Sequence, residues 1–267
     1  MVKYILISFH CFILVQFTIA QENDNWKIDT LNLKEIYIDQ LDQLYCEYDN
    51  GSLITKTKNK TREYYNDFGE ISTIDISNPQ KILLFYRDFQ RLIILDNTLS
   101  VIQELDLETI SSGMISLAIM SKRNDIWVFD EVKTALVRIN NKGKLLTETE
   151  PLYYYKSGFI PNKLQMINQK VVLSNEDGIA LIFDNFGQMI KEIKIPCYGK
   201  YDHSTTHNYC LTKNQLRLNR SESIFSNDYG YLADTTGARR INEVLLFTTN
   251  GRKLVYLKMN GALGVVE

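Results

Sequence analysis

Short apolar segments separated by polar turns recur along the chain at a spacing of roughly 40 residues. The turns between them contain Asp-Asn, Lys-Gly or Asn-Gly, residue pairs that favour hairpins because they tolerate positive φ. A period of this length, built from short strands with four strands in each copy, is typical of a β-propeller. The clearest pairs join residues 91–95 to 101–107, 135–139 to 145–148, 178–183 to 189–195, and 244–248 to 254–258.

Four strands per copy place the first four blades within residues 35–195, and the residues that follow have room for nearly two more. The sequence therefore predicts an all-β propeller of five or six four-stranded blades, with an irregular last blade. Continuous apolar segments such as residues 81–86 indicate strands that are covered on both faces. Further expectations are a ring-closing strand at 26–31, a helical turn at 105–110, a polar loop at 200–206, strands at 208–211 and 215–218, and mostly turns and loop over 221–240.

Residues 1–20 have the pattern of a secretory signal peptide. Lys3 precedes a nearly unbroken apolar run, and Thr18 and Ala20 place small residues before a cleavage site. The alternative is a membrane anchor, but the run is shorter than the roughly 20 apolar residues that a spanning helix needs. We expect a single propeller domain over residues 21–267 that is periplasmic or secreted and is not inserted in the membrane.

The net charge of the chain gives no reason to expect a nucleic-acid or acidic-lipid partner. The formal net charge is -2 and 45% of the residues are hydrophobic, values ordinary for a globular domain. Bulk charge therefore predicts no nucleic-acid partner and no attraction to acidic lipid.

Three cysteines remain after cleavage, and they predict different states. Cys46 lies in an alternating strand pattern and is expected to be a buried free thiol. Cys197 and Cys210 flank a polar loop and are positioned to form a disulfide in an oxidising compartment. With His203 and His207 between them they also have ligand types that suit zinc, but the spacing matches no familiar zinc motif, and a third interpretation is that they are unrelated loop residues. We predict no metal and no cofactor.

Three stretches carry a resemblance to a known family: EIYIDQLDQLY at residues 35–45, IDISNPQKILLFYRDFQRLIILDNTLSVIQELDL at 74–107 and LIFDNFGQMIKEI at 181–193. They resemble an uncharacterised family of exported β-propeller-like proteins of Bacteroidota. The resemblance covers about residues 33–196, is most specific over 78–97, and is lost after about Cys197. It implies export and a propeller fold, and it provides no catalytic residues.

Two loops contain candidate binding residues. Tyr86, Asp88, Phe89 and Gln90 lie in a turn between two apolar strands, and propeller loops commonly carry ligand contacts. The alternative for Asp88 is that its carboxylate caps its own turn. Tyr154 belongs to a run of three tyrosines and is a candidate stacking platform, although tyrosine also commonly lies between core and water.

Candidate catalytic groups are limited to acidic residues at strand ends, namely Asp130, Asp177 and Asp184. Carboxylates at such positions commonly accept backbone hydrogen bonds, whereas glycoside hydrolysis needs two of them across a cleft. The sequence contains no G-x-S-x-G elbow, phosphate-binding loop or EF-hand loop. It therefore favours a non-catalytic binding or scaffold module for a protein or cell-envelope component. The alternative function is a secreted hydrolase or lyase with carboxylates at the central channel.

Overall fold

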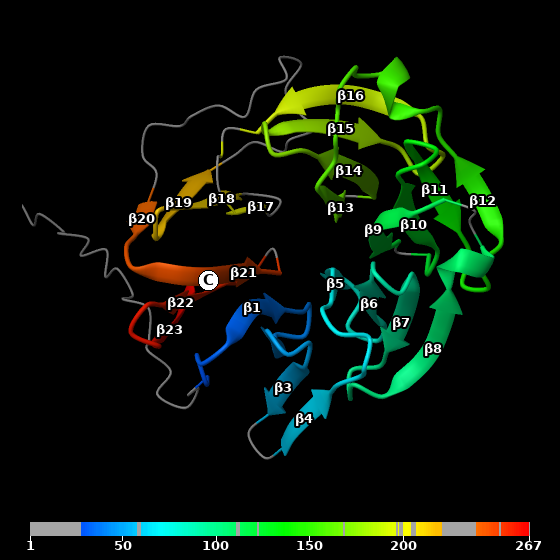
Figure 1. Cartoon of the computed structure of the whole chain (residues 1–267). Coiled ribbons are helices and arrows are strands. Elements are labelled where there is room, and N and C mark those ends of the chain that lie inside the picture. Colours follow the sequence, from blue (N-terminus) through cyan, green and yellow to red (C-terminus); the bar gives the residue numbers. More distant parts are fainter. Residues whose placement is uncertain are drawn as a thin grey trace, which may run out of the picture.

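The chain forms a ring of sheets around a central axis in a computed structural model (Figure 1). The structure describes residues 28–57, 60–110, 113–121, 123–167, 169–195, 197, 200–203, 207–220, 239–250 and 252–266. Within these ranges the strands build six sheets, so the protein is a six-bladed β-propeller and the predicted fold is confirmed. No helix in the described part of the chain is long and apolar enough to cross a membrane.

Each blade is an antiparallel sheet whose strands follow one another in sequence order from the centre outward. Two short 3-10 helices, η1 (Leu107–Thr109) and η2 (Leu152–Tyr154), follow the second and third blades. The strands are β1 (Leu33–Ile38), β2 (Leu44–Tyr48), β3 (Leu53–Thr57) and β4 (Lys60–Tyr64) in blade 1; β5 (Thr73–Asp75), β6 (Ile82–Tyr86), β7 (Arg91–Leu95) and β8 (Val101–Asp106) in blade 2; β9 (Ile115–Met120), β10 (Ile126–Asp130), β11 (Ala135–Ile139) and β12 (Leu145–Glu148) in blade 3; β13 (Lys163–Ile167), β14 (Lys170–Ser174), β15 (Ile179–Phe183) and β16 (Met189–Lys194) in blade 4; β17 (Lys200–His203), β18 (His207–Thr212), β19 (Gln215–Arg220) and β20 (Arg239–Ile241) in blade 5; and β21 (Val244–Thr249), β22 (Leu254–Lys258) and β23 (Leu263–Val266) in blade 6.

Apolar side chains fill the spaces between neighbouring blades. All five residues of β6 and all five of β10 are buried, which explains why these strands have continuous apolar sequences instead of alternating ones. Fully burying a Leu, Ile or Phe side chain stabilises a fold by about 1.5–3 kcal/mol, so these interfaces supply most of the stability. The interface between blades 2 and 3 is typical, with Phe85 and Leu92 packed against Ile115 and Val128.

The ring closes by packing between blade 1 and blade 6. Ile36 and Leu44 share one apolar cluster with Leu257 and Leu263. Two hydrogen bonds support the contact: the Ile38 N–H donates to Thr248 Oγ1 (3.2 Å), and Asn250 Nδ2 donates to the carbonyl oxygen of Asp39 (2.7 Å). The predicted ring-closing strand at 26–31 is not present over residues 28–31, and residues 26–27 lie outside the described part of the chain.

The structure differs from the prediction in three places. Residues 200–203, expected to be loop, form β17, the inner strand of blade 5. The sequence pattern groups the hairpin at 244–258 with those at 91–107, 135–148 and 178–195, which are the second hairpins of their blades. In the structure β21 and β22 form the first hairpin of blade 6, a sheet with three strands among the described residues. The helical turn expected at 105–110 is the shorter η1, because β8 continues to Asp106. The strands predicted at 208–211 and 215–218 are confirmed as β18 and β19, and residues 221–238 are outside the description.

Strand alternation defines two faces of the ring. Turns that follow the first and third strands of each blade lie on one face, and connections that follow the second and fourth strands lie on the other, which we call the loop face. On the first face, a short polar side chain begins four of the described hairpins and accepts backbone N–H bonds, as its residue type predicts. Asp39 binds the N–H groups of Leu41 and Gln43, Asp96 those of Thr98 and Ser100, Asn140 those of Lys142 and Lys144, and Asp184 those of Phe186 and Gln188.

Candidate functional site

Gln90 holds the turn of blade 2 against the first strand of blade 3. Its side chain is buried, and its Nε2 donates to the carbonyl oxygens of Arg87 (2.7 Å) and Ile115 (2.8 Å). Its Oε1 accepts the Ile115 N–H at 2.9 Å. The amide therefore uses donors and acceptor together, and the turn is tied to the neighbouring blade.

A second type of tie recurs in three successive blades. The residue that ends each turn before the third strand has a positive φ, and its carbonyl oxygen accepts an N–H from the connection that follows the fourth strand. At the third of these positions a Cβ would lie 2.6 Å from a backbone oxygen, which accounts for glycine there. The pairs are Gln90 (φ 49°) with Leu107 at 2.8 Å, Thr134 (φ 52°) with Leu152 at 2.7 Å, and Gly178 (φ 75°) with Ile195 at 2.6 Å.

The structure separates the four predicted residues of this turn into two pairs. Tyr86 is fully buried between blades 1 and 2, where its ring meets Phe68 edge-on with centroids 5.5 Å apart. Burial raises the pKa of the Tyr86 phenol far above its usual range. Asp88 and Phe89 are exposed, and the Phe89 ring lies 5.4 Å from that of Phe68. Of the four, only Asp88 and Phe89 present their side chains to solvent.

Tyr154 lies in η2, on the connection from blade 3 to blade 4. It is 69% exposed, and its ring centroid lies 4.6 Å from that of Tyr153, which is also exposed. Tyr155 packs edge-on against Phe183 at 5.6 Å and holds the run to the blade. The tyrosine run thus combines an anchor with two solvent-facing rings.

Exposed apolar side chains gather on the loop face of blades 2, 3 and 4. The segments that carry Phe89, Met114 and Val132 are in contact: Arg87 Nη2 pairs with Glu131 Oε1 at 2.9 Å, and the Glu131 N–H donates to the carbonyl oxygen of Met114, also at 2.9 Å. Monomeric proteins rarely expose large apolar groups together, and such groups commonly mark an interaction site. We call this set the apolar patch; it consists of Phe89, Met114, Val132, Tyr153, Tyr154 and Ile160.

The predicted acidic candidates have structural partners. Asp130 is fully buried and accepts the N–H groups of Val132 and Lys133, both at 3.0 Å. A Cβ on Gly113 would lie 2.2 Å from its Oδ1, so the neighbouring connection is shaped to fit this carboxylate. Asp177 is exposed and accepts a hydrogen bond from Asn175 Nδ2 at 3.3 Å, while Asp184 caps a hairpin on the other face. Asp130 and Asp177 are therefore turn residues of the loop face.

A cluster of charged residues that the sequence did not reveal lies on the inner strands. Lys200 of blade 5 pairs with Glu35 of blade 1, and its Nζ donates to the carbonyl oxygen of Phe247 in blade 6 at 2.9 Å. Burial lowers the pKa of Lys163, and nearby Asp202 opposes that effect. The sequence did not reveal Lys200 because residues 200–206 are predicted to be a loop. The available signal was that two inner strands, β13 and β17, each begin with a lysine, Lys163 and Lys200.

A second missed network is buried in blade 1. Glu47 receives an ion pair from Lys34 Nζ (2.8 Å) and a hydrogen bond from the Tyr37 hydroxyl (2.7 Å), and its side chain is only 3% exposed. Burial raises the pKa of the Glu47 carboxyl despite both partners. Lys34 also pairs with Glu70 at 2.7 Å, which links the blade to its outgoing connection. The arrangement cross-links blade 1 with the connection to blade 2.

Of the three interpretations left open for Cys197 and Cys210, the structure has the disulfide. Cys197 and Cys210 are joined with an S–S distance of 2.07 Å, so their sulfurs are not free to bind zinc. The side chains of His203 and His207 lie outside the description, and the described residues contain no group of three or more metal-ligating side chains. Cys46 is a buried free thiol as predicted, and burial raises its pKa to about 12.

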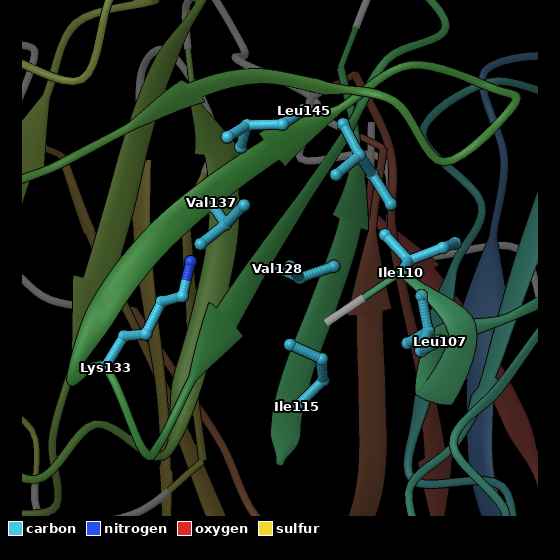
Figure 2. Close-up of a pocket in the computed structure, with 8 residues that line it drawn as sticks. Leu107, Ile110, Ile115, Val128, Lys133, Val137 and Leu145 are labelled. Carbon is cyan, nitrogen blue, oxygen red and sulfur yellow. The ribbon is translucent and has the colours of Figure 1, made fainter. Parts of the chain in front are cut away.

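A small apolar cavity lies between η1 and the sheet of blade 3 (Figure 2). Its volume is about 60 Å³. Figure 2 shows side chains from β10, β11 and β12 on one side and Leu107 and Ile110 on the other. The residues that line it are Leu107, Ile110, Ile115, Val128, Lys133, Val137, Ile139 and Leu145.

Comparisons with known proteins identify the fold. No protein-family model matches the chain, and no curated protein sequence matches it. Among solved structures, a streptogramin B lyase aligns with a TM-score of 0.55 at 8% identity, covering 91% of this chain and 85% of the lyase. BamB from Moraxella catarrhalis aligns with a TM-score of 0.50 at 10% identity, over 86% of this chain and 81% of BamB. The Cps50 (Swd1) β-propeller domain from Myceliophteria thermophila aligns with a TM-score of 0.56 at 9% identity, over 89% of this chain and 97% of that domain. At these identities the likeness extends to the propeller fold alone.

Proposed function

We propose that this chain is an exported, non-catalytic binding module that presents the loop face of blades 2–4 to a protein of the cell envelope. The observation that carries the proposal is the apolar patch. Val132, Tyr154 and Ile160 are 72%, 69% and 79% exposed, and they project from turns of one face. Aromatic and aliphatic groups of this kind supply most of the binding energy at protein interfaces.

Rigidity of the supporting turns strengthens this proposal. The turns under the patch are tied to the next blade or to the following connection by backbone bonds, by the Gln90 amide and by the buried Asp130 carboxylate. A surface held in its binding conformation loses little conformational entropy when a partner docks. The loop face therefore suits a partner that binds a preformed surface.

The alternative is a hydrolase or lyase that uses the channel carboxylates, and the specific observation in its favour is that Glu35 and Asp202 belong to one charge cluster. Both carboxylates are already engaged, Glu35 by Lys200 and Asp202 by Gln165 Nε2 at 3.4 Å. A carboxylate that must first leave such a partner is less available for proton transfer to a substrate. We therefore favour binding over catalysis.

Site-specific photocrosslinking tests the proposal in cells that produce the protein. A photoreactive phenylalanine analogue replaces Tyr154 or Phe89, and a matched control carries it at Phe186, which is 72% exposed on the opposite face. We expect one protein to be crosslinked from both loop-face positions and not from Phe186. Identical products from all three positions, or none from the loop face, would sink the proposal. Fractionation of the same cells tests export, because a cytoplasmic product contradicts that part of it.

A further inference from the structure

We infer that the cavity beside blade 3 receives an aliphatic anchor side chain of the protein partner, in the form of leucine or valine. This inference rests on the proposed function and adds the chemistry of one contact to it. The floor of the cavity is made of deeply buried side chains, those of Leu107, Ile115, Val128 and Ile139. Its rim contains the exposed side chains of Lys133 and Leu145. The space is therefore apolar inside and bordered by residues that a partner can reach.

The volume selects the occupant. An apolar cavity of about 150 Å³ holds benzene and stays dry when empty. The cavity here, at about 60 Å³, is too small for an aromatic ring and suits a branched group such as the isopropyl end of leucine or valine. Lys133 is the one lining residue with a polar side chain; Figure 2 places its ammonium beside Val137, and it pairs with Glu148 at 2.6 Å. A polar side chain would gain little from entering it.

The cavity is continuous with the proposed binding face. Lys133 on its rim directly follows Val132, a member of the apolar patch, in the turn whose backbone is bound by Asp130. A partner that covers Val132 therefore lies next to the Lys133 end of the cavity. The ion pair of Lys133 with Glu148 gives that mouth a polar border, the arrangement in which a buried anchor is commonly surrounded by solvent-facing contacts.

Two substitutions on one strand test the inference. Leu145→Trp places an indole at the mouth, whereas Leu146→Trp adds the same group beside it at a position that does not line the cavity. Both leucines are exposed, at 54% and 45%, so both variants are expected to fold, and thermal unfolding checks this. A second blocking variant, Val137→Leu, fills the space from within and guards against a local effect of the indole.

The probes are N-acetyl-leucinamide and N-acetyl-phenylalaninamide, followed by methyl NMR of Ile115, Val128 and Val137. We expect saturable shifts with the leucine compound alone, lost in Leu145→Trp and Val137→Leu and kept in Leu146→Trp. Blocking the cavity should also lower the affinity for the crosslinked partner about tenfold, which is the loss expected when an apolar void of this size is not filled. Absence of shifts in the wild type, or equal shifts in Leu145→Trp, identifies the cavity as a packing void and overturns the inference. If the cavity is a packing void but a partner is still crosslinked from Tyr154, the proposed function stands and this inference alone is wrong. If no partner is crosslinked from Tyr154 in the otherwise unchanged protein, the proposed function itself is wrong.

Discussion

Replacing Gln90 with alanine is expected to destabilise the propeller more than any exposed substitution in the same turn. The change removes three hydrogen bonds, those to the carbonyl oxygens of Arg87 and Ile115 and from the Ile115 N–H. Each such bond contributes about 1 kcal/mol net, and a buried backbone group left without a partner costs about 1–3 kcal/mol. We therefore expect the free energy of unfolding to fall by about 3 kcal/mol, which is a large share of the roughly 5–15 kcal/mol of a typical domain.

Urea unfolding at 25 °C, followed by circular dichroism, measures this loss. Asp88→Ala is the matched control, since Asp88 is exposed two residues away and its loss should change stability by less than about 0.5 kcal/mol. Gln90→Glu separates shape from hydrogen bonding, because a carboxylate keeps the length of the side chain but cannot donate to the two carbonyl oxygens. It should be at least as destabilising as alanine. If the urea midpoint of Gln90→Ala equals that of Asp88→Ala, the hydrogen bonds of the Gln90 amide contribute nothing to stability and the reasoning is refuted.

Three further changes have defined outcomes. Replacing Cys197 and Cys210 with serine should lower the free energy of unfolding by about 3 kcal/mol, as for other short disulfide loops, and reductant should do the same to the wild type; an unchanged urea midpoint contradicts this. Cys46 should resist iodoacetamide at pH 8 until the protein unfolds, because a pKa of about 12 leaves roughly one thiolate in 10,000; intact mass reports alkylation, and rapid modification of native protein contradicts it. Gly178→Ala should lower the free energy of unfolding by about 1–3 kcal/mol more than Gly158→Ala, measured by thermal unfolding. Both glycines have a positive φ, but only at Gly178 does a new Cβ lie 2.6 Å from a backbone oxygen, so equal losses would exclude that contact as the cause.

The blades could be predicted because their signals are local. Asp96, Asn140 and Asp184 each begin a hairpin through bonds to their own turn, and the apolar strands beside them are read from neighbouring residues. The same local signals are weak around residues 200–203. Strand β17 is polar, and its Lys200 is stabilised by Glu35, which lies far away in sequence.

The candidate site was harder to predict because solvent exposure depends on the whole ring. Its place in a polar turn predicts that Gln90 is exposed, yet its backbone adopts a positive φ and its side chain reaches a strand of the next blade. Val132 and Ile160 have the residue types of a core, but they are exposed. Tyr154 is exposed, as are the candidates Asp88 and Phe89, because a tyrosine run between blades has no strand register that would bury every ring.

The three backbone ties between turns and outgoing connections have a practical consequence for measuring how blades open. The N–H groups of Leu107, Leu152 and Ile195 lie outside the strands, yet each is held by a carbonyl oxygen of its own blade. Amide hydrogens in connecting segments usually exchange with solvent quickly, so these three should stand out as slow signals in deuterium oxide. Each one can then serve as a spectroscopic reporter for a single blade, showing which part of the ring separates first as denaturant is added.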